Sequence, residues 1–496
     1  MTNEVLIVGA GPSGLFAAAE FIRHGLRVRL IERDALPHRE ARATTIQAGT
    51  LEILDSVGLL PAFMEASEHV RTSRIYDSDM AELRSTTFEG LDCRCDFQCV
   101  LPQYETQRIL EEHLTSLGGN VERSVTATKL ELDADGVLVE LAQGDGRVET
   151  VQTSLVIGAG GAHSVTRESM TELLGGATYQ GYFLVADIAM QGPLRRDESG
   201  VICGPAGLLL LSPMPGGRWI SFQDLEENAT ELTAEDVIRR VELRLGSRCR
   251  PTDVAWFSPF RMHRRIVSRF TDGRRFLIGD AAHLSSPFGG EGLNSGLHDS
   301  YDLAWKVALV LHGHARRSLL EDYAMERLIA DRHVLDVSDQ VHGGIVSIAE
   351  AVRQHRRVPA AITDPFADAL VRNARAMIDI DYKGSPLVAD YTEPGSITTD
   401  PHPGQRYPDW IRFGGTTHHL LFFGPAADAE SLTRLGQRWS NRVDISRDPM
   451  VNPARAGIPN GGVVLIRPDG HIGFRAASTG TAALEALERH LGSYLI

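Results

Sequence analysis

The chain has 496 residues, which at the usual size of a protein domain predicts about three domains. Hydrophobic residues make up 43% of it and charged residues 23%, so we expect a folded chain with a buried core and not a disordered one. The 65 acidic and 50 basic residues give a net charge of −15, which disfavours nucleic acid as a partner. No apolar run reaches the roughly 18 residues of a membrane span, so we expect no membrane partner.

The five cysteines indicate a reducing compartment. Their odd number and wide spacing do not suit a disulfide framework. Cys93, Cys95 and Cys99 lie close together, but no second Cys/His pair accompanies them, so we expect reduced thiols and no metal site. The apolar N-terminus contains glycines and lacks a basic segment, which is typical of a strand and not of a signal peptide. We therefore expect a cytoplasmic protein.

The N-terminus has the pattern of a nucleotide-binding unit. Residues 5–8 and 28–31 are short apolar runs, and a helical pattern lies between them. The turn from the first run into the helix is GAGPSG, where glycine permits a tight turn and close approach of backbone to a pyrophosphate. A carboxylate ends the second run, where it accepts hydrogen bonds from ribose hydroxyls. These features predict a parallel sheet that binds a dinucleotide through Gly9, Gly11, Pro12, Ser13, Gly14, Glu32 and Arg33.

Two kinds of strand are expected in the middle of the chain. A loop and a helix over 98–118 precede short strands over 120–151, with a hairpin at Asp135-Gly136. Residues 155–157 and 276–278 are apolar runs typical of buried parallel strands. By contrast, 179–270 contain short alternating strands broken by proline and glycine, which predicts a mostly antiparallel layer inserted into the first domain.

The last third of the chain is expected to contain a long helical tract and then a separate small domain. The tract runs from about 296 to 358, and proline and glycine are frequent between 384 and 408. The pattern beyond predicts a small α/β domain with a strand at 420–423, a helix at 428–439, a strand at 442–445, a hairpin over 463–475 and a final helix.

A second motif indicates which nucleotide binds. Residues 275–283 read RFLIGDAAH, and residues 287–294 read PFGGEGLN, followed by GLHDSYDLAWK at 296–306. These segments resemble the second FAD-binding motif of the class A flavoprotein monooxygenases, the family of para-hydroxybenzoate and phenol hydroxylases. The resemblance implies that FAD contacts Asp280, Pro287, Gly290, Gly292, Leu293 and Asn294. It assigns no catalytic residue, and we expect His283 to be structural or a neighbour of the flavin.

Three further segments agree with this family. Arg42 and Gln103 stand where family members have an arginine and a glutamine near the FAD, although a surface arginine and a helix-cap amide are the alternatives. LIRPDG at 465–470 resembles the thioredoxin-like third domain of phenol and aromatic polyketide hydroxylases. No cysteine follows Cys249, so this domain cannot perform dithiol chemistry.

The resemblance covers essentially the whole chain and implies an α/β fold. A Rossmann-type, glutathione-reductase-like FAD domain would carry an inserted, mostly antiparallel substrate domain and a C-terminal thioredoxin-like α/β domain. The expected boundaries give 1–75, 100–178 and 271–385 to the FAD domain. They give 76–99 and 179–270 to the substrate domain, 386–408 to a linker, and 409–496 to the thioredoxin-like domain.

One position departs from the family pattern. Family members usually have an Asp-Gly pair after the third buried strand, and that aspartate helps to hold FAD and the nicotinamide cofactor. Here the segment reads GAGGAHSVTR at 158–167, with Gly160 in place of the carboxylate. Loss of a charged hydrogen-bond acceptor costs about 1.5–3 kcal/mol. We therefore hypothesise weaker or slower use of NAD(P)H than in the rest of the family.

The implied reaction is an aromatic hydroxylation. NADPH or NADH would reduce the bound FAD, and O2 would then form a flavin C4a-hydroperoxide that hydroxylates a phenolic or aromatic polyketide-type substrate. Alternatives are an epoxidation, a Baeyer–Villiger-type insertion or another oxidation of a specialised metabolite, and a non-catalytic flavin-fold binding protein. Residues 208–211, Met214, Trp219 and Phe222 are walls of the substrate pocket or plain core. The expected partner is a small aromatic molecule, and a homodimer is left open.

Overall fold

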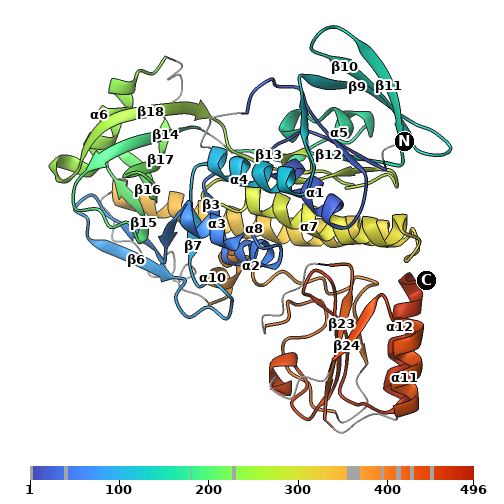
Figure 1. The fold of residues 1–496 in the computed structure, drawn as a ribbon. Coiled ribbons are helices and arrows are strands. Elements are labelled where there is room, and N and C mark those ends of the chain that lie inside the picture. The colour runs from blue at the N-terminus through green and yellow to red at the C-terminus, as the bar shows by residue number, and fades with distance from the viewer. Residues whose placement is uncertain are drawn as a thin grey trace.

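A computed structural model describes residues 4–37, 43–179, 181–225, 231–354, 369–391, 396–408, 415–424, 429–446 and 452–496. Figure 1 shows a central α/β body, a layer rich in strands beside it, and a smaller C-terminal body next to the long central helices. None of the described helices combines the length and the apolar character that a membrane crossing requires. All five cysteines are free thiols, as expected.

A five-stranded parallel sheet forms the middle of the central body, in the order β20-β12-β1-β2-β8. Its central strand is buried because both faces of the sheet are covered, and successive side chains point to opposite faces. Val5 and Ile7 pack with the helices on one side, whereas Leu6 and Val8 pack against a three-stranded meander on the other. The strands are β1 (Val5–Val8), β2 (Val28–Glu32), β8 (Val121–Arg123), β12 (Leu155–Gly158) and β20 (Arg275–Leu277), and the meander is β9 (Val125–Leu132), β10 (Val137–Gln143) and β11 (Val148–Thr153).

Helices cover the first face of this sheet. Their apolar sides form the largest hydrophobic core of the protein. The expected helical tract over 296–358 is two helices, because the chain turns at Gly313, where φ is +73°, before it continues. The helices of this body are α1 (Pro12–Arg23), α2 (Ala48–Ser56), α3 (Leu60–Glu65), α4 (Gln103–Ser116), α5 (Val165–Ser169), α7 (Gly292–Leu311), α8 (Leu319–Arg353) and α10 (Ala369–Ala376).

A seven-stranded sheet forms the second layer, in the order β18-β14-β17-β16-β15-β5-β6. Every neighbouring pair is antiparallel except β15 and β5, so the expected mostly antiparallel layer is confirmed. Helix α6 (Ala234–Leu245), which begins with a capping box at Thr233, covers its outer face. The strands are β5 (Thr72–Tyr76), β6 (Glu82–Thr87), β14 (Tyr182–Gln191), β15 (Glu198–Gly204), β16 (Gly207–Met214), β17 (Arg218–Leu225) and β18 (Arg250–Phe260).

Two small three-stranded sheets connect the layers. One has the order β3-β7-β4 and the other β13-β19-β21. Their strands are β3 (Thr45–Ile46), β4 (Glu68–Val70), β7 (Gln98–Val100), β13 (Gly175–Thr178), β19 (His263–Ile266) and β21 (His283–Leu284).

The C-terminal body is a mixed five-stranded sheet with the order β22-β26-β25-β23-β24. Its core includes Trp305, Leu309 and Leu319 from the central body, so the two bodies share buried apolar surface. This body lies against α7 in Figure 1. Its elements are β22 (Ala389–Tyr391), β23 (His418–Phe423), α11 (Ala429–Arg438), β24 (Val443–Ser446), β25 (Gly462–Ile466), β26 (Ile472–Ala476) and α12 (Thr481–Tyr494), and β22 lies in the stretch that the sequence suggests is a linker.

Candidate cofactor and substrate cavity

A cavity of about 840 Å³ lies between the parallel sheet and the seven-stranded sheet. One end is formed by the start of α1 and by the 3-10 turn Gly279–Ala281 that follows β20. The other end is lined by strands of the seven-stranded sheet and by Val341 and Ile345 of α8. A single space therefore connects the expected nucleotide motif with the inserted layer.

Each of the three glycines of the first motif is required for a different structural reason. A β-carbon at Gly14 would lie 1.9 Å from the carbonyl oxygen of Gly9, and one at Gly9 would lie 2.5 Å from that of Ala159. Gly9 also has φ +111°, a conformation that favours glycine. A β-carbon at Gly11, by contrast, would meet no protein atom within 4 Å. Because Gly11 lines the cavity, its missing side chain leaves space for a group that approaches the N-terminus of α1.

Glu32 supports this turn from the next strand. Its Oε2 accepts a hydrogen bond from the backbone N–H of Ala10 at 2.8 Å, and its Oε1 accepts one from Asp34 at 3.0 Å. Gln103 begins α4, and its Oε1 accepts a hydrogen bond from the N–H of Ala43 at 3.2 Å. The carboxylate of Glu32 thus fixes the shape of the glycine turn, and the ribose contact expected of it stays a prediction.

Asn294 fixes the second glycine-rich loop. Its side-chain oxygen accepts a hydrogen bond from the N–H of Gln47 at 2.8 Å, and its amide donates to the carbonyls of Thr45 and Gly290 at 2.8 and 2.7 Å. Gln47, which the sequence analysis missed, donates in turn to the carbonyl of Gly289 at 3.0 Å. Both side chains are fully buried, so this loop is held rigidly at the wall of the cavity.

Most of the sequence-predicted cofactor residues meet in this one place. Gly9, Gly14, Glu32 and Asn294 support the wall without lining it. Arg42 lies outside the described residues. Those that line the cavity are Gly11, Pro12, Ser13, Arg33, Gln103, Asp280, Pro287, Gly290, Gly292 and Leu293.

The inserted layer supplies an apolar end to the cavity. Of the candidate walls named from the sequence, Leu210 and Phe222 line it. Leu209 and Trp219 instead pack in the core beneath α6, because neighbouring residues of a strand point to opposite faces. Met214 is completely buried in a separate hydrophobic cluster with Val185 and Ile220. The apolar lining consists mainly of Ile75, Val185, Val201, Leu210, Phe222, Phe260, Met262, Phe288, Val341 and Ile345.

Comparison with known protein families decides the assignment. The model of an FAD binding domain matches residues 2–338, and the model of an aromatic-ring hydroxylase C-terminal domain matches residues 401–493. The chain belongs to the FAD-dependent aromatic-ring hydroxylases. This confirms the resemblance drawn from the sequence motifs, together with FAD as the cofactor.

Individual relatives span nearly the whole chain. A 6-methylpretetramide 4-monooxygenase of Streptomyces rimosus is 31% identical, over 97% of this chain and 92% of its own. A pentachlorophenol 4-monooxygenase of Sphingobium chlorophenolicum is 29% identical, over 94% of this chain and 86% of its own. A crystal structure of aklavinone-11 hydroxylase with FAD and aklavinone is 23% identical and shares the fold with a TM-score of 0.82, over 99% of this chain and 98% of that one. The chain is thus a flavoprotein monooxygenase by family.

Two buried charges beside the cavity are not among the predicted site residues: Glu291 lies within the PFGGEGLN segment but was assigned no role, and no motif marks Arg375. Arg375 on α10 lines the cavity, and burial lowers the pKa of its guanidinium. Glu291 lies in the second glycine-rich loop, between Gly290 and Gly292, and burial raises the pKa of its carboxyl to about 7. The two are 84 residues apart in sequence, and only the fold brings them near enough for their charges to interact.

His283 lies outside the cavity lining, in a buried charged cluster. Its Nε2 is 2.8 Å from Asp299 of α7, which also accepts a hydrogen bond from the N–H of Gly279 at 2.8 Å. Arg327 of α8 donates to Asp299 at 2.7 Å and to Asp331 at 2.8 Å. Burial alone would lower the pKa of His283, but Asp331 and Asp299 outweigh it and raise that pKa to about 9. The cluster ties the loop that carries Asp280 to both long helices.

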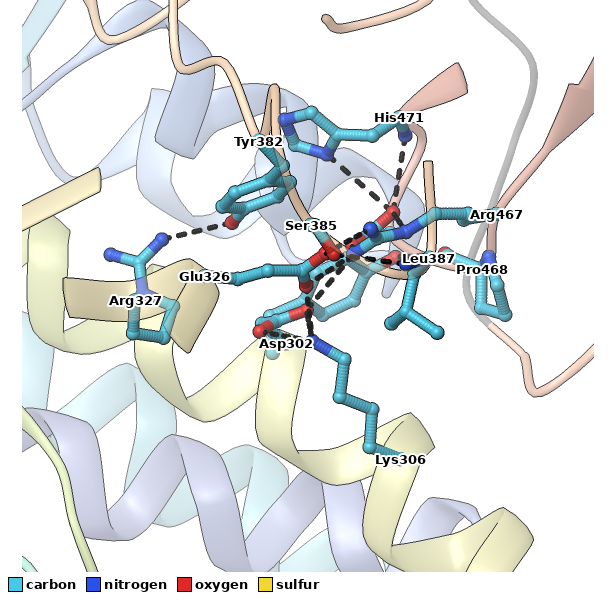
Figure 2. A network of polar contacts seen from close by, with 12 residues as sticks. Asp302, Lys306, Glu326, Arg327, Tyr382, Ser385, Leu387, Arg467, Pro468 and His471 are labelled. Carbon is cyan, nitrogen blue, oxygen red and sulfur yellow. Dashed lines mark hydrogen bonds and ion pairs between the residues drawn. The ribbon is translucent and has the colours of Figure 1, made fainter. Parts of the chain in front are cut away.

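A second charged network joins the central body to the C-terminal body (Figure 2). Arg467, the residue after β25, donates to Glu326 of α8 at 2.5 and 2.9 Å, and Lys306 of α7 donates to the same carboxylate at 2.5 Å. Lys306 also donates to Asp302 at 2.7 Å, and Asp469 accepts from Arg467 at 3.2 Å. All five side chains are almost completely buried.

Both clusters have the composition of candidate metal sites. Within the described residues, His283, Asp299 and Asp331 form one group of close ligand atoms, and Asp302, Glu326 and Asp469 form another. Cationic side chains already donate into each group, Arg327 into the first and Lys306 with Arg467 into the second. These carboxylates therefore act as acceptors for protein cations.

Proposed function

We propose that this protein is an FAD-dependent hydroxylase of phenolic or polyketide-type aromatic rings that takes its electrons from NADPH or NADH. The observation that carries the proposal is the single cavity with a nucleotide cradle at one end and an apolar chamber at the other. The relatives named as monooxygenases of 6-methylpretetramide and of pentachlorophenol support substrates of this class.

The cradle has the features that FAD requires. The open space at Gly11 and the N-terminus of α1 suit a pyrophosphate, and Asp280 in the turn after β20 suits the hydroxyls of the ribityl chain. The loop over Gly290, Gly292 and Leu293 would lie along the flavin ring. When bound, FAD accepts a hydride from the nicotinamide and activates O2, so that one oxygen atom reaches the substrate ring.

The protein's own part is to bind and orient the ring and to keep water from it. Phe222, Phe260 and Phe288 provide apolar and aromatic surface against a flat substrate. The rigid loop held by Asn294 and Gln47 keeps the wall next to the flavin fixed. A fixed distance between the cofactor and the substrate ring lowers the barrier, because the two reactants need not be brought together in the transition state.

The roles of the individual cofactor residues and the domain boundaries belong to the same proposal. The FAD domain would comprise 1–75, 100–178 and 271–385, and the substrate domain 76–99 and 179–270. Arg42 would complete the flavin site. Gly160 would make the nicotinamide step slower than in relatives that have a carboxylate there.

The test is anaerobic stopped-flow reduction of the FAD-loaded protein by NADPH and by NADH, with and without a panel of phenols and aromatic polyketides. We expect one class of compound to accelerate reduction, and mass spectrometry of the aerobic product to show one added oxygen with the ring intact. A ring-opened product would favour the insertion alternative. If no compound accelerates reduction, dithionite reduction followed by O2 shows whether oxygen transfer still occurs. Absence of any oxygenated product from both routes would refute the proposal.

A further inference from the structure

Arg375 is an unusual arginine in this protein. Its side chain is 8% exposed and lines the cavity, yet its Nε has no hydrogen-bond partner among the described residues. Its nearest aromatic contact is the ring of Phe88, 5.5 Å from the guanidinium carbon. The other buried arginines all donate to carboxylates, carbonyls or hydroxyls of the protein, namely Arg167, Arg244, Arg275, Arg327, Arg467 and Arg475.

Glu291 is buried beside the cavity without lining it, and it also lacks hydrogen-bond partners among the described residues. It is 1% exposed, and neither carboxylate oxygen has a hydrogen-bond partner among the described residues. The carboxylate folds back over Gly289, where a β-carbon would lie 1.7 Å from its Oε2. Its charge acts on Arg375, but no hydrogen bond joins the two side chains in the described part of the chain. The pair therefore balances charge without a hydrogen bond between the two side chains.

A buried Nε without an acceptor among the described residues is costly, because it has lost its water and gained no partner. A ligand that brings an anionic oxygen into the cavity would remove this cost. The planar fork of arginine suits two adjacent oxygens, such as those of a hydroxyl beside a ring carbonyl or a second hydroxyl.

We propose that Arg375 binds the ionised oxygen of the substrate, a phenolate or the enolate of a ring β-dicarbonyl, and that Glu291 is a positioning residue that holds the guanidinium at the cavity wall. This inference rests on the proposed function and deepens it, because it selects acidic phenols over neutral aromatic rings. A phenolate donates more electron density to its ring than the neutral phenol does. Binding in the ionised form thus prepares the ring to receive an electrophilic oxygen.

The test uses binding without turnover, in FAD-loaded protein with no nicotinamide present. The probes are alizarin and 4-nitrophenol, whose visible spectra change on ionisation, and 4-nitroanisole is the neutral matched ligand. Spectra are taken at a pH below the ionisation of each free probe. We expect wild-type protein to bind at least one phenol in its ionised form and to bind it more tightly than 4-nitroanisole.

Arg375→Gln should weaken the binding of the ionised probe by at least about tenfold and return its spectrum to the neutral form. Arg375→Lys should retain part of the effect, because it keeps the charge and loses the fork. Arg372→Gln is the matched control, since Arg372 lies on the same helix and does not line the cavity. Bound FAD, measured by absorbance, reports whether each variant is folded.

Three outcomes would overturn the proposal. Wild-type protein could bind neither phenol in ionised form, Arg375→Gln could bind the ionised probe as well as wild type does, or Arg375→Gln could change only the flavin midpoint potential. The last outcome would assign Arg375 to the charge of the reduced flavin. None of these readouts requires hydroxylation, so failure here is separate from failure of the oxygen-transfer assay that tests the proposed function.

Discussion

Replacement of Arg467 by methionine should strongly destabilise the protein, and the structure allows the effect to be estimated. Arg467 is 1% exposed and joins the C-terminal sheet to Glu326 on α8. The cluster holds three carboxylates, on Asp302, Glu326 and Asp469, and among the described residues Lys306 and the imidazole of His471, 3.5 Å from Asp469, would remain beside them. Methionine fills much of the same volume, so the change removes charge and hydrogen bonds more than it removes packing.

Removal of one member of a buried ion pair costs about 3–5 kcal/mol, because its partner stays buried and uncompensated. A second ion pair provides the matched comparison. Arg455 and Asp92 also join the two bodies, at 2.9 Å, but their side chains are 40% and 63% exposed. Such a pair contributes about 1 kcal/mol or less, since water screens the charges in both states. We therefore expect Arg467→Met to cost at least three times as much as Arg455→Met.

The assay is urea unfolding of FAD-loaded protein, followed by far-ultraviolet circular dichroism and by tryptophan fluorescence. Trp305 and Trp439 both lie in the core shared by the two bodies, so their emission reports on its integrity. A double variant Arg467→Met/Glu326→Leu should lose less than the sum of the single losses, by about 0.5–3 kcal/mol. If Arg467→Met and Arg455→Met cost the same, or if the double variant is strictly additive, the reasoning from buried charge is wrong.

Three further predictions concern the cofactor end of the molecule. Gly11→Ala should leave the melting temperature of the apoprotein unchanged but weaken FAD binding in a titration, because its β-carbon enters only the cavity. Gly14→Ala should instead lower the melting temperature, because its β-carbon clashes with the carbonyl oxygen of Gly9. Gly160→Asp should speed anaerobic flavin reduction by NADPH about tenfold or more, because it restores the charged acceptor that relatives have there. The backbone can accommodate the aspartate, since φ at Gly160 is −77° and the new β-carbon stays 3.4 Å or more from its neighbours. An unchanged rate would count against a role for the missing carboxylate. The raised pKa of His283 means that its protonation stabilises the folded state, fully below the unfolded pKa near 6.5, and that this stabilisation is lost as pH rises through about 9. The free energy of unfolding should therefore fall across that window. Urea titrations at a series of pH values should show this fall, and His283→Gln should flatten it.

Features whose cause is local can be predicted from the residues alone. The GAGPSG turn predicts a nucleotide cradle because the positive φ at Gly9 and the close packing at Gly14 are requirements of adjacent residues. The GEGLN segment and the C-terminal hairpin over 463–475 were likewise predicted from short motifs, and both have their expected secondary structure. Local patterns also predicted a mostly antiparallel inserted layer, which the sheet order confirms.

Which side chains face the cavity, and which charges lie close together, depends on how distant segments pack. Leu209 and Leu210 read alike in sequence, but the pleat of β16 and the position of α6 bury one and turn the other toward the cavity. Arg375 lies in no motif, and its charge interacts with that of Glu291 only because the fold brings α10 near residues 289–294. Burial and pairing depend on segments that are distant in the chain, so their energies cannot be read from any local pattern.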